Sequence, residues 1–355
     1  MNYLRTMRRV LPTVETFVQG IRAGNRVVLG QAITLVESAR PDHQALAQEV
    51  IAELLHPTNS NPIRTDVHPG GQQPATNNPT LRIAVTGAPG VGKSTFIEAL
   101  GTHLTQQGQR VAVLAIDPTS SVSKGSILGD KTRMEQLSAN DMAFIRPSPS
   151  GESLGGVARK TRETILLVEA AGYGTVIIET VGVGQSEIAA HSMTDLFLLL
   201  LLPGAGDELQ GIKRGIVEMA DILAVNKADG ERMKLANQAR AHYLNATHLF
   251  PPKPNGWTPK VLTCSAEQGT GIAEIWLTIE AFKAHILDNG FFQENRKQQA
   301  RYWFKETLQA GIQTAFFSHP KVRKQLETLE PAVLAGQMSP FAAAEAVLKS
   351  WSEKF

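Results

Sequence analysis

The sequence predicts an α/β fold in which a mostly parallel sheet is covered by helices on both faces. Short apolar runs alternate with helical patterns between residues 81 and 288. Most of these runs are continuous stretches of Val, Ile and Leu, as expected for strands that are buried on both faces. The predicted strands cover residues 81–86, 111–116, 142–146, 175–180, 195–202, 221–226 and 260–264.

Helical regions flank the predicted sheet. Residues 1–55 have apolar side chains at helical spacing, and residues 56–80 form a linker rich in Pro and Asn. The α/β domain is expected over 81–288, followed by a C-terminal helical arm over 289–355 that includes a helix at about 339–352. An apolar stripe in this arm needs a partner surface and comprises Ala300, Trp303, Phe304, Leu308, Ile312 and Ala315.

The composition restricts the class of protein. Hydrophobic residues make up 42% and charged residues 19% of the 355 residues, so a large core is available and global disorder is disfavoured. A net charge of +2 is too balanced to indicate nucleic acid as a partner. The single cysteine, Cys264, provides neither a disulfide framework nor a cysteine metal cluster, and it fits a reducing, cytoplasmic location.

No membrane segment is expected. The most apolar run, residues 196–202, is far shorter than the ~20 residues that a spanning helix needs, and it is interpreted as a central strand. The basic start, with Arg5, Arg8 and Arg9, resembles a transit peptide, but its lack of serine and its helical pattern favour an ordinary helix.

The chain is organised around a phosphate-binding loop with the pattern G-x-x-x-x-G-K-S. The loop follows the first predicted strand and opens a helix, which is the context that this motif requires. Its backbone N–H groups are expected to surround phosphates, with Lys93 on the β- and γ-phosphates and the Ser94 hydroxyl on Mg²⁺. The predicted nucleotide-binding residues here are Gly87, Ala88, Pro89, Gly90, Val91, Gly92, Lys93, Ser94 and Thr95.

A second motif predicts that the base is guanine. Asn226-Lys227-Ala228-Asp229 has the pattern N-K-x-D and follows a predicted strand. Asp229 can accept hydrogen bonds from N1–H and the 2-amino group of guanine, and adenine lacks both donors. Lys227 is expected along the base plane, and Asn226 is expected to join this loop to the phosphate loop. Ser265 and Ala266, after the last predicted strand, are expected at the edge of the base.

Acidic residues at strand ends predict a metal site beside the phosphates. Glu179 ends the strand at 175–180, and Gly182 is positioned to offer its N–H to the γ-phosphate. Asp117 and Asp130 are further candidates for Mg²⁺, because this hard ion prefers carboxylates and water. The structural alternatives are an ordinary strand end for Glu179, a turn cap for Asp117 and a solvated side chain for Asp130.

Residues 204–215 are rich in glycine and charge and follow a predicted central strand. They are interpreted as a loop that places Lys213 or Arg214 on developing phosphate charge. The alternative is an N-capped helix with a basic face. Val183 directly follows Gly182, at a position where a glutamine could orient the attacking water. Because valine is apolar, we expect slow intrinsic hydrolysis that a partner accelerates.

Together these motifs resemble the ArgK/MeaB/MMAA family of P-loop GTPases: GAPGVGKS, DPTSS, SILGDKTRM, ETVGVGQSE, GAGDELQGIKRG, NKAD and CSA. The resemblance covers about 81–280 strongly. It implies a GTP-hydrolysing chaperone that uses GTP/GDP and Mg²⁺. Such a chaperone would gate the delivery of adenosylcobalamin to an acyl-CoA mutase, such as methylmalonyl-CoA mutase, and would protect or reactivate this mutase.

By matching motif, the resemblance also implies roles for individual residues. Lys93, Glu179 and Lys213 become catalytic residues, while Ser94, Asp117, Asp130 and Glu179 become metal-side residues. The C-terminal helices would form a homodimer arm. The competing function is a P-loop kinase that phosphorylates a protein or small molecule, and the N-K-A-D motif disfavours it because guanine recognition suits switches.

Overall fold

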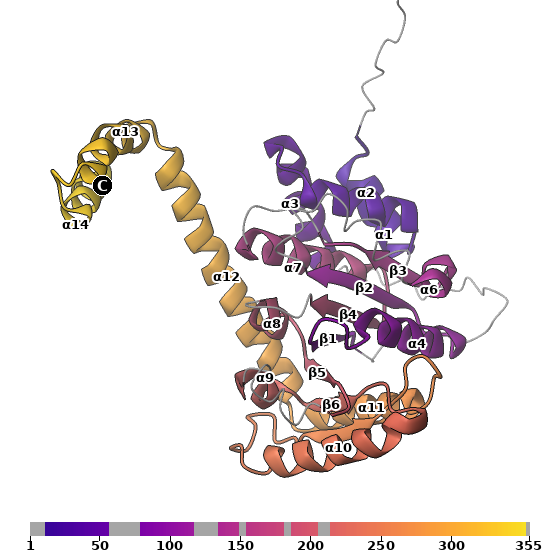
Figure 1. The fold of residues 1–355 in the computed structure, drawn as a ribbon. Coiled ribbons are helices and arrows are strands. Elements are labelled where there is room, and N and C mark those ends of the chain that lie inside the picture. The colour runs from indigo at the N-terminus through magenta and orange to yellow at the C-terminus, as the bar shows by residue number, and fades with distance from the viewer. Residues whose placement is uncertain are drawn as a thin grey trace, which may run out of the picture. The chain divides into compact units, whose positions relative to one another are not determined.

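The computed structural model describes residues 11–56, 79–116, 134–148, 154–180, 186–204 and 214–352 (Figure 1). Its centre is a seven-stranded sheet in which every strand pair is parallel, with the order β3-β2-β4-β1-β5-β6-β7. All seven predicted strands are therefore present. The strands are β1 (Leu81–Gly87), β2 (Val111–Ile116), β3 (Ala143–Arg146), β4 (Thr175–Thr180), β5 (Leu196–Leu201), β6 (Ile222–Val225) and β7 (Lys260–Thr263).

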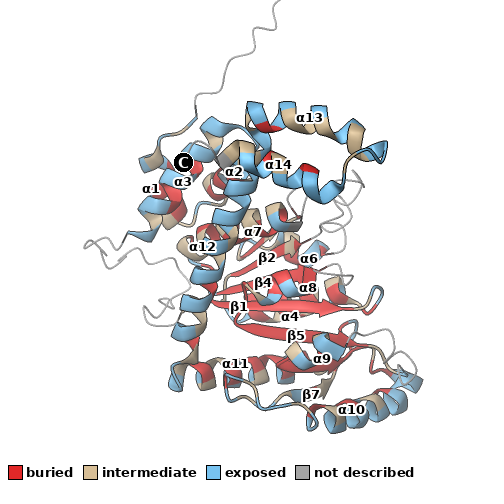
Figure 2. Cartoon of the chain, turned by 90° about the vertical axis from the view of Figure 1, so that its left-hand side faces the viewer, coloured by how far each residue is buried: buried red, intermediate tan, exposed pale blue. Residues whose placement is uncertain are grey.

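Helices cover both faces of the sheet, and the strands between them are buried (Figure 2). On one face, α4 (Lys93–Gln106) and α11 (Ile272–Asp288) pack together over alternate residues of β1, with α6 (Glu135–Ala139) against α4. On the other face lie α7 (Leu154–Ala170) and α8 (Ser186–His191). Two further helices pack on the β5–β7 half, namely α9 (Arg214–Met219) and α10 (Met233–Thr247), the latter preceded by η2 (Gly230–Arg232).

Two aspartates fix the register of neighbouring strands in the same way. Asp195, just before β5, donates its backbone N–H to the carbonyl of Arg82 and accepts the Arg82 N–H at Oδ2, both at 2.8 Å. Asp221, just before β6, makes the equivalent pair of bonds with the backbone of Phe197, at 2.8 and 2.9 Å. Because a one-residue slip would leave each buried carboxylate without these donors, the two clamps favour a single register.

A buried ion cluster lies at the amino end of β1 and β5. The Arg82 guanidinium binds Glu169 of α7 through two hydrogen bonds of 2.7 Å. Arg296 donates to Asp195 at 2.8 Å and to Glu169 at 3.2 Å, and it also reaches the carbonyl of Thr80. Burial raises the pKa of Asp195 to about 7, and the nearby Arg82 opposes this shift. The cluster therefore joins β1, β5, α7 and the first turns of the helix that follows α11.

The N-terminal helices are α1 (Val14–Arg22), α2 (Arg26–Glu37) and α3 (Pro41–Leu55), and they pack on one another and on α7. Thr13 caps α1 by accepting the N–H of Thr16, and Asn25 caps α2 by accepting two N–H groups. Each cap satisfies backbone donors that the first helical turn leaves free. Phe17 and Ile33 are fully buried in this layer.

The chain divides into two compact units, Met1–Arg296 and Lys297–Phe355. The helix α12 (Phe291–Ser318) runs from the first unit into the second, which also contains α13 (Pro320–Leu334) and α14 (Pro340–Ser352). The sequence pattern did not predict α13. The helices α13 and α14 pack on each other around Val322, Ala343 and Val347. Among the described residues, no helix has the length and apolar character needed to cross a membrane.

Candidate nucleotide-binding site

The phosphate-loop motif connects the end of β1 to the start of α4. Gly92 has φ +94° and occupies the N-cap of α4, and Gly87 has φ +151° where a Cβ would lie 2.6 Å from the carbonyl oxygen of Leu200. Glycine is therefore required at position 92 for its positive φ. At position 87 it is required both for its positive φ and because β5 approaches closely. The loop ends with the first N–H groups of α4 facing the site, an arrangement that favours anions.

The Lys93 side chain folds back across this loop. Its Nζ donates to the carbonyl oxygens of Gly87, at 2.8 Å, and Ala88, at 3.1 Å. Burial lowers the pKa of Lys93, and the negative charges of Glu179 and Glu187 partly oppose the shift. A desolvated ammonium held at the phosphate loop is suited to a polyanion, since phosphate charge would replace the lost hydration.

Glu179 lies beside the hydroxyl of Ser94. The strands β4 and β1 are paired with Glu179 opposite Val85, which brings the acid alongside the start of the phosphate loop. Ser94 Oγ donates to Glu179 Oε1 at 3.1 Å. Next to this contact, Thr180 Oγ1 donates to Thr86 Oγ1 at 2.9 Å and ties the ends of the two strands together. A hydroxyl and a carboxylate oxygen at this spacing form a donor set that fits Mg²⁺.

The N-K-A-D segment follows β6 and contacts the phosphate loop directly. Asn226 Nδ2 donates to the carbonyl oxygen of Val91 at 2.9 Å, and Lys227 Nζ donates to that of Gly90 at 2.8 Å. Lys227 has φ +59°, and it is the one residue other than glycine with positive φ among the described residues. This left-handed backbone turns the lysine toward the phosphate loop rather than along β6.

The loop after β7 completes the group. Asn226 Oδ1 accepts the backbone N–H of Ala266 at 3.0 Å, and Ser265 Oγ donates to Asp229 Oδ2 at 2.7 Å. Ser265 is fully buried, whereas Asp229 remains slightly exposed. Hydrogen bonds from Ser265 and then Arg232 lower the pKa of Asp229, so its carboxylate is ionised at neutral pH and presents acceptors only.

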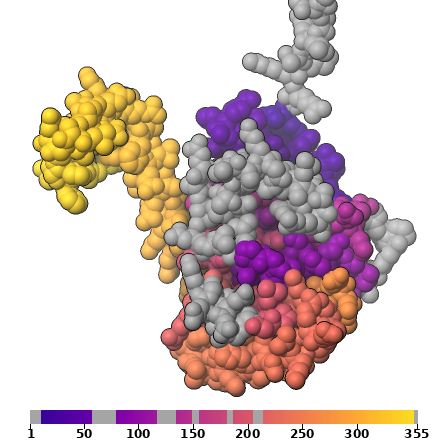
Figure 3. Space-filling view, in the orientation of Figure 1, coloured from indigo at the N-terminus to yellow at the C-terminus, as the bar shows by residue number. Residues whose placement is uncertain are grey.

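The structure thus gathers the phosphate loop, Glu179, the N-K-A-D segment and the loop after β7 at the carboxyl ends of β1, β4, β6 and β7. In the space-filling view, the purple α4 segment and the orange α10 segment lie on one face of the first unit (Figure 3). Four predicted site residues lie outside the described residues, namely Asp117, Asp130, Gly182 and Lys213.

Two residues of this group had no individual role predicted from the sequence, although residues 183–187, which include Glu187, are predicted to form a switch segment that is sensitive to the γ-phosphate. Glu187, at the start of α8, is 2% exposed, and its charge acts on Lys93. Its buried position in α8 is a feature of the tertiary fold and has no sequence signal of its own. Arg232 contacts Asp229 from the next helical turn, and the i, i+3 spacing is its only signal in the sequence.

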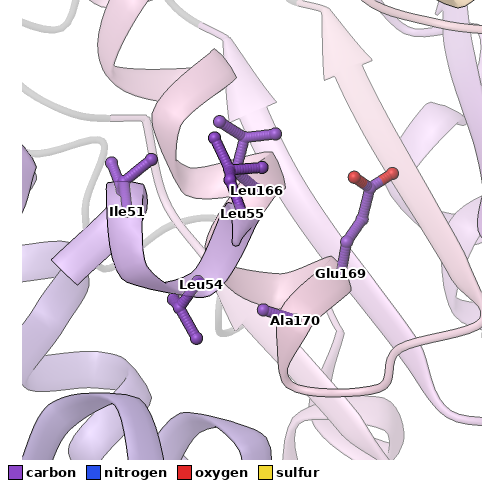
Figure 4. A pocket seen from close by; sticks show the side chains of 6 residues that line it. All are labelled: Ile51, Leu54, Leu55, Leu166, Glu169 and Ala170. Carbon is purple, nitrogen blue, oxygen red and sulfur yellow. The ribbon is translucent and has the colours of Figure 1, made fainter. Parts of the chain in front are cut away.

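A separate small pocket lies between α3 and α7, lined by Ile51, Leu54, Leu55, Leu166, Glu169 and Ala170 (Figure 4). Glu169 pairs with Arg82 at the start of β1, so this pocket lies toward the amino ends of the strands, away from the phosphate loop. Its lining is almost entirely apolar. No cluster of three or more metal-binding side chains occurs in the part of the chain that the structure describes.

A family model and several known proteins match most of this chain. A family model described as "Methylmalonyl Co-A mutase-associated GTPase MeaB" matches residues 29–321. A probable GTPase of Mycobacterium tuberculosis is 47% identical over 337 residues, covering 95% of both chains. The mitochondrial methylmalonic aciduria type A homolog of Mus musculus is 43% identical, covering 96% of this chain and 80% of its own.

A solved structure resembles the whole chain. The crystal structure titled LAO/AO transport system kinase aligns with a TM-score of 0.71 and 35% sequence identity. The alignment covers 96% of this chain and 98% of the other.

Proposed function

This chain belongs to the family of methylmalonyl-CoA mutase-associated GTPases called MeaB and is a GTP hydrolase; on that premise we propose that it is a chaperone for an adenosylcobalamin-dependent acyl-CoA mutase. In this proposal GTP binding and hydrolysis gate delivery of the cofactor to the mutase and protect or reactivate it. The observation that carries the nucleotide part is the pair of contacts from Asn226 and Lys227 to the phosphate loop. These contacts hold the N-K-A-D segment against the phosphate loop.

The geometry of the site supports the following nucleotide contacts. Backbone N–H groups of the phosphate loop and the Lys93 ammonium bind the β- and γ-phosphates. Asp229 accepts from N1–H and the 2-amino group of guanine, Ser265 holds its carboxylate, and Ala266 borders the base. Adenine would leave the Asp229 acceptors unpaired, and that is the proposed source of selectivity.

Mg²⁺ is proposed as the resident cation. Ser94 and Glu179 would hold it, with Asp117 and Asp130 as further carboxylates from outside the described residues. When bound, the cation neutralises charge on the β- and γ-phosphates. Removal of Mg²⁺ by a chelator is expected to weaken binding of GTP in the wild type, and the Ser94→Ala variant is expected to lose most of this dependence.

Hydrolysis is proposed to proceed by in-line attack of water on the γ-phosphorus, with GDP as the leaving group. The Val183 side chain cannot hydrogen-bond to the attacking water, so intrinsic turnover is expected to be slow. A partner would accelerate it by ordering residues 204–215, which place Lys213 on the transferring phosphoryl group. A rate of ~10 s⁻¹ for the purified protein alone, typical of ordinary enzymes, would contradict this part of the proposal.

The proposed partner is a methylmalonyl-CoA mutase-type enzyme, supported by the description of the family. A homodimer is proposed for the C-terminal unit, because α12 exposes large apolar side chains at Phe304, Leu308, Ile312 and Phe317. Neither nucleic acid nor a membrane is proposed as a partner, and the proposed location is the cytoplasm.

The test of the chaperone function is a pull-down of a purified methylmalonyl-CoA mutase on the immobilised protein, with GDP or a non-hydrolysable GTP analogue. Retention that depends on the nucleotide, together with faster GTP hydrolysis in the presence of mutase, is expected. Lys213→Ala is expected to bind the mutase and lose the acceleration, while Lys93→Ala is expected to lose nucleotide dependence. Equal retention under all nucleotide conditions, with no change in rate, would contradict the proposal.

A competition arm addresses the kinase alternative. ATP is expected not to displace labelled GDP at concentrations where GTP displaces it fully. Equal displacement by ATP would exclude guanine selectivity and favour a kinase.

A further inference from the structure

The guanine-reading carboxylate already has an internal donor on its exposed side. Arg232 is the last residue of η2, three positions after Asp229, and its side chain folds back so that Nη2 donates to Asp229 Oδ1. Its backbone N–H also donates to the Asp229 carbonyl oxygen, at 3.0 Å, which fixes the short turn between them. The contact is therefore built into the local backbone and needs no distant element.

The two oxygens of Asp229 accept from two different side chains. Ser265, fully buried, donates to Oδ2 from the protein interior. The Arg232 side chain is 50% exposed, whereas the Asp229 side chain is only 10% exposed. Oδ1 is thus bonded by the solvent-facing partner, and little open surface is left around the carboxylate for a second donor from that side.

The guanidinium of Arg232 carries the same kind of donors as the edge of guanine. N1–H and the 2-amino group of guanine form a planar pair of N–H donors on one carbon, and a guanidinium presents the same arrangement to a carboxylate. We propose that Arg232 competes with the guanine base for Oδ1 of Asp229, so that it sets nucleotide affinity and the discrimination between bases at this site. This inference rests on the proposed assignment of Asp229 as the guanine reader.

The expected size of the effect follows from the exposure of the pair. A half-exposed ion pair contributes little free energy, so the loss of the Arg232–Asp229 pair should change the affinity for GDP by about twofold to fivefold. Removing the competitor frees Oδ1 for the base, so the direction is tighter binding. This direction separates competition from simple support of the carboxylate, because removing a supporting residue would weaken binding.

The experiment is isothermal titration of GDP and IDP into the full-length wild type, Arg232→Met and Lys234→Met. Methionine replaces the unbranched aliphatic part of the arginine side chain and lacks donors. Lys234 is exposed on the first turn of α10, so its replacement removes the same charge close by and serves as the matched control. IDP retains N1–H but lacks the 2-amino group, so the ratio of GDP to IDP affinity reports how fully both oxygens of Asp229 accept from the base.

Arg232→Met is expected to bind GDP about twofold to fivefold more tightly than the wild type, with a higher ratio of GDP to IDP affinity. Lys234→Met is expected to bind no more tightly than the wild type. Unchanged or weaker GDP binding by Arg232→Met would overturn the inference. If Asp229 does not read guanine at all, a different result is expected: Asp229→Ala would bind GDP as tightly as the wild type. Thermal unfolding of each variant checks that it folds.

Discussion

The side-chain amide of Asn226 joins two loops that are far apart in the sequence, because its Nδ2 lies 2.9 Å from the carbonyl oxygen of Val91. Its Oδ1 accepts the N–H of Ala266 at 3.0 Å, and Asn226 is 2% exposed. One side chain thus connects the phosphate loop, the segment after β6 and the loop after β7. Phosphate and base contacts are proposed to act together through it.

Asn226→Ala is expected to weaken both folding and nucleotide binding, because it leaves the Val91 carbonyl and the Ala266 N–H buried without their partner. The loss in unfolding free energy is expected to be about 1–3 kcal/mol. Asn226→Asp keeps the acceptor for Ala266 but removes the donor to Val91, so it should lose GDP affinity as well. Urea unfolding and GDP titration measure the two effects, and a variant with native stability and native affinity would show that the bridge is dispensable.

Gly92→Ala tests the close approach of the two loops. A Cβ at Gly92 would lie 2.7 Å from Asn226 Nδ2, and the residue has φ +94°. Gly108, with φ +78° and no heavy atom within 4 Å of the position that a Cβ would take, is the matched control. Gly108→Ala should cost about 1–2 kcal/mol from its left-handed backbone alone.

The Gly92→Ala substitution is expected to lower the free energy of unfolding clearly more than the Gly108→Ala control does, because the methyl group also displaces the Asn226 amide. Urea unfolding of both variants in nucleotide-free buffer gives the comparison. Equal costs would mean that the Asn226 amide moves aside freely.

Lys93→Met is expected to change nucleotide affinity and stability in opposite directions. The ammonium donates to phosphate in the proposed complex, so GDP affinity should fall by about 10-fold to 100-fold. Burial lowers the pKa of Lys93, which means that burying the ammonium costs folding free energy, so the nucleotide-free variant should be at least as stable as the wild type. Parallel losses of affinity and stability would indicate a structural lysine instead.

Asp195 is expected to make stability depend on pH. The unfolded chain releases this proton near the usual value of 3.8, whereas the buried group in the folded protein has a pKa of about 7. Between these values the folded protein holds the proton that the unfolded chain has lost, so the contribution of Asp195 to stability falls as pH rises from about 4 to 7 and is constant above.

The comparison with Asp195→Asn isolates this effect. The unfolding free energy of the wild type minus that of the variant should decrease toward neutral pH, by at most about 1.4 kcal/mol per pH unit for one proton. Parallel pH profiles for the two proteins would show that Arg296 and Arg82 keep Asp195 ionised throughout.

The sheet was predictable because its strands are continuous apolar runs, for example Leu196–Leu201. The helix α13 was missed, and its sequence carries Pro320 and Pro331, which suggest breaks. Pro320 occupies the first turn, where no helical hydrogen bond is lost, and Pro331 lies in the last turn.

The motifs of the candidate site that the structure describes were recognisable in the sequence because each follows a predicted strand and has a characteristic spacing. The strand order could not be predicted from the sequence, since β4 lies between β1 and β2 although it comes later in the chain. That order is what brings Glu179 to Ser94. The burial of Glu187 depends on side-chain packing, and the contact of Arg232 with Asp229 has only its i, i+3 spacing as a signal in the sequence.

The most direct test of the guanine site is the base preference of Asp229→Asn. Xanthine carries N1–H and a C2 carbonyl, so an asparagine amide, with one acceptor and one donor, complements xanthine as a carboxylate complements guanine. Competition titrations with GDP and XDP should show that the wild type prefers GDP and that the variant prefers XDP. If the variant kept the wild-type preference for GDP, Asp229 would not contact the base and the proposed reading of guanine would be wrong.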